Sequence, residues 1–362
     1  MLKWLGTALA LTGGLALAVQ GVIRERLRRA DAYACPPGVE WSGFVEINGA
    51  PQWMLIRGSD TRNPLLLFLH GGPGWPATFL AGRRYSALLE KHFVVAHWEQ
   101  RGAGRSFAAR PAGTRLTNDQ LVADVDAVAH HLLAEFECDK LYLVGHSWGS
   151  LLGVLAITAH PERYHAFIGV GQFVNALEQE RLSLRFCHNW LECRGEKRRR
   201  AKLAALGEPP YRRTFEAIVR QRSFLQRAGG SFGQGYSPAR MLFDAAVSPY
   251  CRLGELLRFI RGGVITNRHL LEDDYWHWAL DTTHLKFSIP VCFFLGRRDY
   301  NTPCELAERY LERIEAPRKE KVIFESAAHM IPFEDPERYN REILRVFAPS
   351  ADESSRCAAV SN

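Results

Sequence analysis

The chain has 362 residues, of which 47% are hydrophobic and 23% charged. These proportions are ordinary for a globular protein and exclude disorder of the whole chain. The length suffices for one large domain with an insertion, or for two domains. The net charge of +7 comes largely from clustered arginines. One cluster, residues 194–202, is typical of a solvated helix face, so we expect no nucleic-acid partner.

The eight cysteines contain no C-x-x-C pair and no spacing that is typical of a metal site. Several lie in apolar stretches, as Cys292 does between Val291 and Phe293, where a thiol behaves as a small hydrophobic group. We therefore expect neither a disulfide framework nor a bound metal.

Residues 4–23 contain no charged side chain, and twenty such residues can cross the hydrocarbon core of a bilayer. Four arginines follow within residues 24–29, against a single Lys3 before the segment. This bias predicts a membrane anchor with a basic linker in residues 1–30 and places the rest of the chain in the cytoplasm. The alternative is an exported protein, with Ala16-Leu17-Ala18 as the cleavage site of a signal peptide.

The first elements of the folded part are predicted to be strands. Residues 44–47 and 53–57 form two short strands joined through Asn48-Gly49, a hairpin turn signal. The apolar runs 65–69 and 93–98 are uninterrupted, which suits strands buried on both faces of a parallel sheet.

Strands and helices then alternate. Thr117 begins a helix, with Gln120 placed as in a capping box. A buried strand over 141–144 leads to a small-residue helix over 151–159, and residues 167–170 make the next strand. Alternation of this kind predicts a doubly wound α/β architecture.

The pattern changes over residues 174–285, which contain helical segments and no strand-like run. Alternation resumes with strands at 289–295 and 322–324, a helix between them and a last helix near Pro336. We therefore predict a mostly parallel α/β core that is interrupted by a helical cap. The predicted divisions are a core of 31–173 and 286–348, a cap of 174–285 and a flexible tail of 349–362.

A candidate nucleophile stands at Gly145-His146-Ser147-Trp148-Gly149, which fits the G-x-S-x-G pattern between a buried strand and a helix. The serine on such a strained turn needs small neighbours two residues away on either side. A hydroxyl also needs a base, and the base needs an orienting acid.

Asp299 and His329 each follow a predicted strand, and we expect them to be the acid and the base. Asp299 could instead form the turn before Tyr300, and a loop histidine is often a solvated surface residue. The order serine, acid, histidine, each just past a strand end, favours the catalytic interpretation. His284 is an alternative base, disfavoured because no strand leads into it.

The oxyanion of acyl transfer needs preorganised donors. The backbone N–H of Trp148 would be one, and the glycine-rich loop 70–74 would supply the second, from Gly72 or alternatively Gly71. His70 and His146 are predicted to be structural hydrogen-bonding residues. Arg101 could support the site through an ion pair or belong to a structural turn.

The motifs at 70–74, 98–106, 145–149 and 296–299, together with the loop that carries His329, resemble those of proline iminopeptidases and their close α/β-hydrolase relatives. The resemblance implies an α/β-hydrolase fold, a triad of Ser147, Asp299 and His329, an oxyanion hole at Gly72 and Trp148, and no cofactor. This sequence differs from that family at Glu99, where aspartate is usual.

The resemblance implies an aminopeptidase of the proline iminopeptidase type, acting through an acyl-enzyme on a small-molecule or short-peptide substrate. Such an enzyme needs acids in the cap that bind the substrate ammonium group. The candidates are Glu178, Glu180, Asp244 and Glu255, each of which could equally be a solvated helix charge. The alternatives are an esterase, thioesterase or lactonase for an apolar acyl substrate, and a non-catalytic binding protein on the same scaffold.

Overall fold

The computed structural model describes residues 19–23, 25–26, 29, 37–82, 85–109, 116–233, 235–251 and 253–348. The predicted tail, and the predicted anchor apart from these few positions, lie outside the described residues. Within the described ranges, no helix has both the length and the apolar character needed to cross a bilayer.

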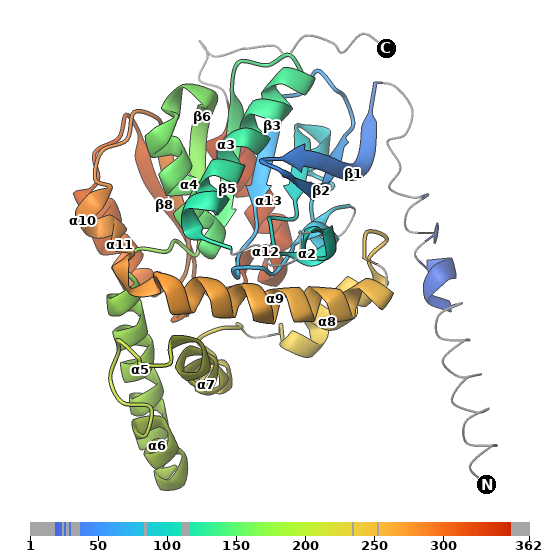
Figure 1. Ribbon diagram of the computed structural model, residues 1–362. Coiled ribbons are helices and arrows are strands. Elements are labelled where there is room, and N and C mark those ends of the chain that lie inside the picture. The colour runs from blue at the N-terminus through green and yellow to red at the C-terminus, as the bar shows by residue number, and fades with distance from the viewer. Residues whose placement is uncertain are drawn as a thin grey trace, which may run out of the picture.

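In the described part of the chain, eight strands form one sheet in the order β1-β2-β4-β3-β5-β6-β7-β8 (Figure 1). The pairs β1·β2 and β2·β4 are antiparallel, and the other five pairs are parallel. The strands are β1 (Val39–Ile47), β2 (Ala50–Gly58), β3 (Leu65–Leu69), β4 (Val94–Trp98), β5 (Leu141–His146), β6 (Tyr164–Val170), β7 (Val291–Gly296) and β8 (Lys319–Phe324).

The hairpin between β1 and β2 turns at Asn48 and Gly49, which have φ angles of +47° and +73°. Two consecutive positive φ angles are the signature of a tight turn whose twist matches the flanking strands. Ile47 pairs directly with Ala50 across this turn. The predicted hairpin is therefore confirmed.

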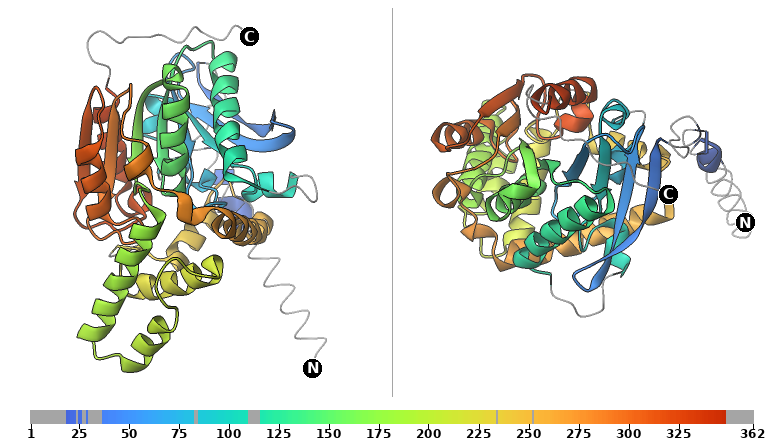
Figure 2. Two further views of the ribbon diagram at one scale, coloured as in Figure 1. Left: turned by 60° about the vertical axis from the view of Figure 1, so that its left-hand side comes forward. Right: turned by 90° about the horizontal axis from the view of Figure 1, so that it is seen from above.

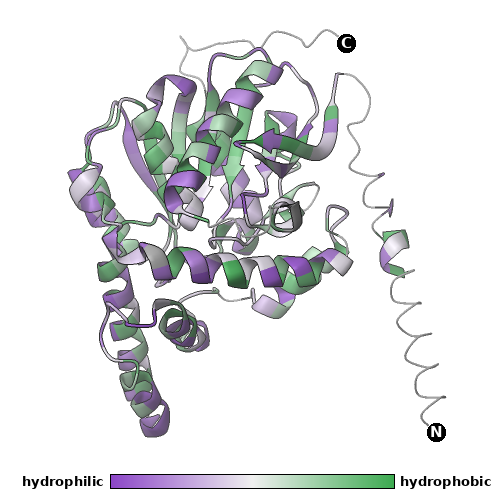
Figure 3. Ribbon diagram, viewed as in Figure 1, coloured by the Kyte–Doolittle hydropathy of each residue, from purple (hydrophilic) through white to green (hydrophobic). Residues whose placement is uncertain are grey.

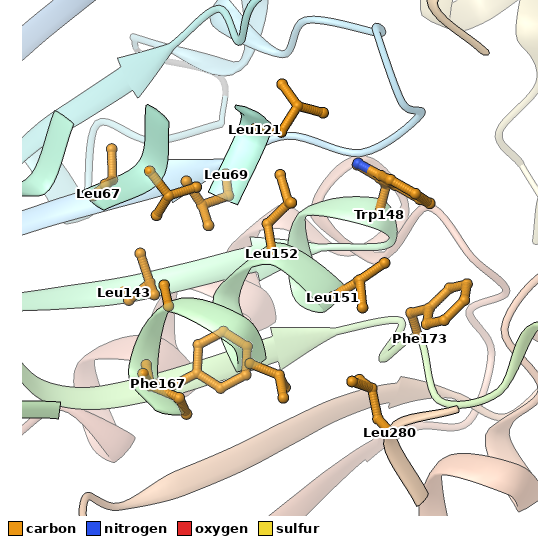
Figure 4. Close-up of a cluster of buried hydrophobic side chains, with 14 of the residues drawn as sticks. Leu67, Leu69, Leu121, Leu143, Trp148, Leu151, Leu152, Phe167, Phe173 and Leu280 are labelled. Carbon is orange, nitrogen blue, oxygen red and sulfur yellow. The ribbon is translucent and has the colours of Figure 1, made fainter. Parts of the chain in front are cut away.

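Both faces of the parallel strands are covered by helices. On β3, Leu65, Leu67 and Leu69 belong to one hydrophobic cluster, and Leu66 and Phe68 belong to the other. The first cluster is covered by α3 (Asn118–Glu135), α4 (Trp148–Ala159) and α11 (Cys304–Arg313), and the second by α13 (Pro336–Val346). Figure 4 shows leucines of the strands meeting Leu151 and Leu152 of α4. The predicted doubly covered sheet is confirmed.

Thr117 caps α3, as predicted, by accepting a hydrogen bond from the backbone N–H of Gln120. The Gln120 side chain does not complete the capping box, because its amide donates to Asp124 at 3.0 Å. Asp124 also pairs with Arg101 at 2.6 Å, so this helix start is tied to the core by a buried ion pair.

The cap inserted between β6 and β7 is helical in its described residues and lies at one end of the sheet (Figure 1). The helix α9 runs across that end, and α5 and α6 project away from the core (Figure 2). The short α6 is mostly hydrophilic (Figure 3). The cap helices are α5 (Ala176–Cys193), α6 (Lys197–Ala204), α7 (Thr214–Arg227), α8 (Pro238–Val247), α9 (Leu253–Asp273) and α10 (Leu280–Thr283).

Polar contacts join the cap to the core loops below it. Arg105 of α2 (Gly104–Ala109) pairs with Glu99 of the core at 2.7 Å and with Glu255 of α9 at 2.8 Å. Thr266, also on α9, donates to the backbone carbonyl of Gly102 at 2.7 Å. The cap is therefore held against the loop that follows β4.

Five of the described cysteines are free thiols. Cys138 differs, because it forms a disulfide bond. Cysteine spacing could not reveal this bond, since pairing depends on how close two distant chain segments come.

Candidate active site

Ser147 occupies the sharp turn between β5 and α4, with φ +55° and ψ −119°. This is a strained backbone conformation for a residue other than glycine. A Cβ atom at Gly145 would lie 2.3 Å from the carbonyl oxygen of Gly149, and one at Gly149 would lie 2.1 Å from that of Leu69. The turn therefore requires glycine on both sides of Ser147, as the sequence analysis predicted.

The structure brings together the three side chains that were predicted to act together. His329 Nε2 lies 2.8 Å from Ser147 Oγ, and His329 Nδ1 lies 2.7 Å from Asp299 Oδ2. The three residues follow β5, β7 and β8, whose carboxyl ends share one edge of the parallel sheet. Asp299 and His329 are buried.

Asp299 was expected to be either a turn residue or the acid that orients His329, and its contacts fit both roles. Its Oδ1 accepts the backbone N–H groups of Asn301 at 2.8 Å and Thr302 at 3.0 Å. Its Oδ2 accepts the Thr302 hydroxyl at 2.9 Å as well as the His329 ring. The turn therefore orients the carboxylate toward His329. Thr302 could not be singled out from the sequence, because a threonine before a proline is an ordinary turn pattern.

The loop of His329 is held from both sides. Glu334 of α12 (Ile331–Glu334) accepts the backbone N–H groups of Ala328 at 2.7 Å, Met330 at 3.3 Å and Gly233 at 2.9 Å. His146 Nε2 lies 2.9 Å from the carbonyl oxygen of His329 and donates to it. Burial lowers the pKa of His146 to about 3, so this ring is neutral, and its predicted structural role agrees with these contacts.

The glycine-rich loop after β3 is held by Gln100, which the sequence analysis did not single out. The Gln100 backbone N–H donates to His70 Nε2 at 3.1 Å, and its side chain donates to the His70 carbonyl oxygen at 2.8 Å. Burial lowers the pKa of His70 to about 4, which keeps the acceptor nitrogen unprotonated. Arg101 forms an ion pair, as one of its two alternatives predicted, and its partner is Asp124 of α3.

The backbone of this loop lies directly against the serine. A Cβ atom at Gly71 would lie 3.0 Å from Ser147 Cβ, and Gly72 has φ +126°, which favours glycine. Gly72 and Trp148 both line the same cavity as Ser147. Trp148 is the first residue of α4, where backbone N–H groups have no partner within the helix.

A cavity of about 860 Å³ opens above Ser147 and His329, within the size range of small-molecule sites. Its walls come from the core loops and from the cap helices α7 and α9.

His284 is absent from its lining in the described chain, so the alternative base lies elsewhere. In the described residues, no three His, Cys, Asp or Glu side chains are arranged to hold a metal ion.

The four cap acids considered as amine ligands are all engaged elsewhere, and none lines the cavity. Glu180 pairs with Arg222, Asp244 with Arg240, and Glu255 with Arg105. Glu178 is a half-buried residue that pairs with Arg181. The sequence could not show the partners of Glu180 and Glu255, because Arg222 and Arg105 come from other elements.

Comparison with known proteins agrees with this geometry. A family model described as the alpha/beta hydrolase family matches residues 66–342. One curated relative, "Probable aminopeptidase YbaC" of Bacillus subtilis, is 29% identical over 301 residues, which cover 83% of this chain and 94% of the relative. A "Proline iminopeptidase" of Thermoplasma volcanium is 24% identical over 308 residues, covering 84% and 95%. These relatives confirm the resemblance inferred from the motifs.

Solved structures share the fold. A proline iminopeptidase of Mycobacterium smegmatis matches with a TM-score of 0.61 at 16% identity, over 84% of this chain and 97% of its own. A bacterial membrane phospholipase A matches with a TM-score of 0.62 at 20% identity, over 96% and 97%. At such identities the likeness establishes the fold alone.

Proposed function

Because the chain belongs to the alpha/beta hydrolase family, we propose that it is a serine hydrolase with Ser147 as its nucleophile. One observation carries the proposal: an unbroken row of contacts from Ser147 Oγ through the His329 ring to Asp299, at 2.8 and 2.7 Å. A serine becomes nucleophilic when a base takes its proton and an acid orients that base.

In the first half of the reaction, Ser147 Oγ attacks the substrate carbonyl carbon while its proton passes to His329 Nε2. Asp299 stabilises the imidazolium ion that forms. When the tetrahedral intermediate collapses, the leaving group takes the proton from His329 and the acyl group stays on Ser147. A water molecule then gives its proton to His329 and attacks the acyl carbon. The carboxylic acid product leaves, and Ser147 recovers its proton from His329.

The oxyanion of both intermediates would accept hydrogen bonds from the backbone N–H groups of Trp148 and Gly72. The location of Trp148 at the start of α4 supports its role, since the helix dipole there favours negative charge. For Gly72, the support is that its loop borders Ser147 and lines the cavity. Gly71 remains the alternative donor, because it packs on the serine itself. No cofactor enters this mechanism.

Two substrate classes are candidates within this function. The names of the curated relatives favour an aminopeptidase that acts on a short peptide, the class implied by the motifs. The apolar cavity walls favour an esterase-type enzyme that acts on a neutral acyl substrate. A non-catalytic binding protein would have no need for a serine, histidine and aspartate in proton-transfer contact.

Labelling with a fluorophosphonate probe, which forms a covalent bond with an activated serine, tests the proposal. We expect labelling of the native chain at pH 7 and none of Ser147→Ala, whose turnover should fall at least about 10³-fold. Ser223→Ala is the matched control, because Ser223 lines the same cavity and its hydroxyl donates to the Arg220 carbonyl. A native chain that is not labelled, or a labelled Ser147→Ala variant, would overturn the proposal.

The cellular location rests on the sequence alone. We infer from the uncharged residues 4–23 and the arginines after them that the N-terminal segment associates the chain with a membrane, with the catalytic domain in the cytoplasm. Removal of residues 1–30 should then move the protein from the membrane fraction to the soluble fraction. The alternative is export, which the disulfide bond of Cys138 favours because such bonds are rare in the cytoplasm. A cleaved N-terminus in the mature protein would indicate it.

A further inference from the structure

In the part of the chain that the structure describes, no acidic side chain lines the cavity above Ser147. Among the described residues that line it, none is Asp or Glu, and Arg222 is the one Lys or Arg side chain. Much of the remaining wall is apolar, with contributions from the cap and the core loops, including Trp75, Phe79, Phe215, Ile218, Val264 and Leu271.

A substrate with a free N-terminal amine brings a positive charge next to the bond that is cleaved. Moving an ammonium group from water into apolar surroundings is strongly unfavourable unless a carboxylate pairs with it. The neutral amides of Gln179, Gln226 and Asn267 in the cavity wall can accept hydrogen bonds, but they cannot balance a full charge.

Glu180 is the cap acid that comes nearest to the role of amine ligand, but its carboxylate is fully occupied. It is completely buried on α5 and pairs with both terminal nitrogens of Arg222, with Nη1 at 2.8 Å. It also accepts the Tyr275 hydroxyl at 2.7 Å and the Gln221 amide at 3.1 Å. In this pair it is Arg222 that lines the cavity, so a substrate ammonium group would meet a cation.

The other candidate acids are held by their own partners away from the cavity. Asp244 of α8 accepts hydrogen bonds from Tyr236 and Arg240 of the cap and from Tyr85 of the core, which hold its carboxylate in place. Glu255 accepts two hydrogen bonds from Arg105. Neither carboxylate could reach a substrate amine without breaking these contacts.

We propose that the cavity selects substrates with a neutral, apolar acyl group and discriminates against acyl groups that carry a free α-amine. The proposal rests on the serine-hydrolase function and narrows its substrate class. It separates this chain from the activity that its relatives' names suggest. The ion pair between buried Glu180 and partly exposed Arg222 is the structural element that keeps a negative charge away from the acyl group.

A matched pair of esters tests the proposal directly. The p-nitrophenyl esters of proline and of cyclopentanecarboxylic acid have acyl rings of the same size and differ in the charged ring nitrogen. We expect kcat/KM at pH 7, divided by each ester's spontaneous hydrolysis rate, to favour the cyclopentane ester by at least about 100-fold. The Ser147→Ala variant supplies the background rate.

A chain-length series tests the apolar wall. For linear p-nitrophenyl esters from butyrate to octanoate, kcat/KM should rise by up to about fourfold per added methylene that becomes buried. Equal rates across the series would contradict an apolar acyl site.

The Arg222→Met variant tests the role of the ion pair, because it removes the cation and leaves the Glu180 carboxylate beside the cavity. In variant protein that still reacts with the fluorophosphonate probe, we expect the ester ratio to move at least about tenfold toward the prolyl ester. An unchanged ratio would contradict the role given to this pair.

The outcomes separate the two proposals. A labelled native chain that prefers the prolyl ester would overturn the substrate inference and leave the serine-hydrolase function standing. A native chain that neither reacts with the probe nor hydrolyses any ester would overturn both.

Discussion

The carboxylate of Glu334 accepts the backbone N–H of Ala328 at 2.7 Å, one residue before His329. The same side chain accepts the N–H of Met330, so it spans the proposed catalytic histidine from both sides. A third hydrogen bond, from Gly233, joins this loop to the cap region. Glu334 therefore sets the position of the His329 backbone without touching Ser147.

The first prediction concerns Glu334 as a positioning residue. Glu334→Gln keeps the shape of the side chain but replaces one acceptor oxygen by a donor, so one N–H contact is lost. We expect kcat to fall about tenfold with little change in KM, because the base is displaced while the cavity is kept. The lost negative charge should also move the acidic limb of the pH profile of kcat/KM to lower pH. A purely structural role would lower stability but leave that limb in place.

The second prediction concerns the acid. Asp299→Asn keeps much of the turn but removes the charge that stabilises the imidazolium ion, so we expect kcat to fall about 10³- to 10⁴-fold. Thr302→Val is the comparison, since it removes one donor to Asp299 and should cost about tenfold or less. Steady-state rates on a p-nitrophenyl ester measure both. Similar losses in the two variants would contradict the role of Asp299.

The third prediction concerns the close packing around the nucleophile. The Cβ atom of Gly149→Ala would lie 2.1 Å from the carbonyl oxygen of Leu69, which is backbone and has little room to move. We expect a loss of about 3 kcal/mol or more in the free energy of unfolding. Gly254→Ala is the control, because nothing lies within 4 Å of a Cβ atom there. Its stability should change by no more than about 1 kcal/mol. Urea denaturation compares the two.

The fourth prediction is a loss of stability in mild acid. Burial lowers the pKa of His70 to about 4, and of His97 and His146 to about 3. In the unfolded chain these rings take up protons near pH 6.5, so the unfolded state binds more protons below that pH. The free energy of unfolding should therefore fall between pH 6.5 and 4, by up to about 1.4 kcal/mol per pH unit for each ring.

His97 allows this prediction to be checked with one substitution. In the described part of the chain, neither ring nitrogen of His97 has a hydrogen-bond partner. His97→Leu should therefore remove its share of the pH dependence without breaking a hydrogen bond. Denaturation curves at pH 7 and pH 5 give the slope for both proteins. If the free energy of unfolding of the variant changes with pH as steeply as that of the native protein, His97 does not contribute to the loss of stability in acid.

Local sequence patterns were sufficient for the strands and for the three side chains that we propose as nucleophile, acid and base. Uninterrupted apolar runs such as 65–69 predict strands that are covered on both faces, because only such strands can be apolar at every position. Ser147, Asp299 and His329 could be found because each lies in the loop that follows a strand, and parallel strands bring their carboxyl ends to one edge. The position of each motif relative to the predicted strands was enough for these predictions.

The supporting contacts could not be predicted, because they join elements far apart in the sequence. Gln100 was passed over in favour of Arg101, and only packing shows which of these neighbours reaches His70 and which reaches Asp124. Glu334 resembles any charged residue of a short helix until its three backbone donors are seen.

The sequence by itself determined the fold class, the family and the identity of the proposed nucleophile, acid and base, since these depend on periodicity and on motifs at strand ends. Only the tertiary structure decided the electrostatics of the cavity. The charge of Glu180 matters to a substrate only if it faces the cavity unpaired, and that depends on Arg222 and Tyr275 arriving from other helices. The sequence shows which residues can carry a charge, but whether a buried charge is paired depends on the folded chain.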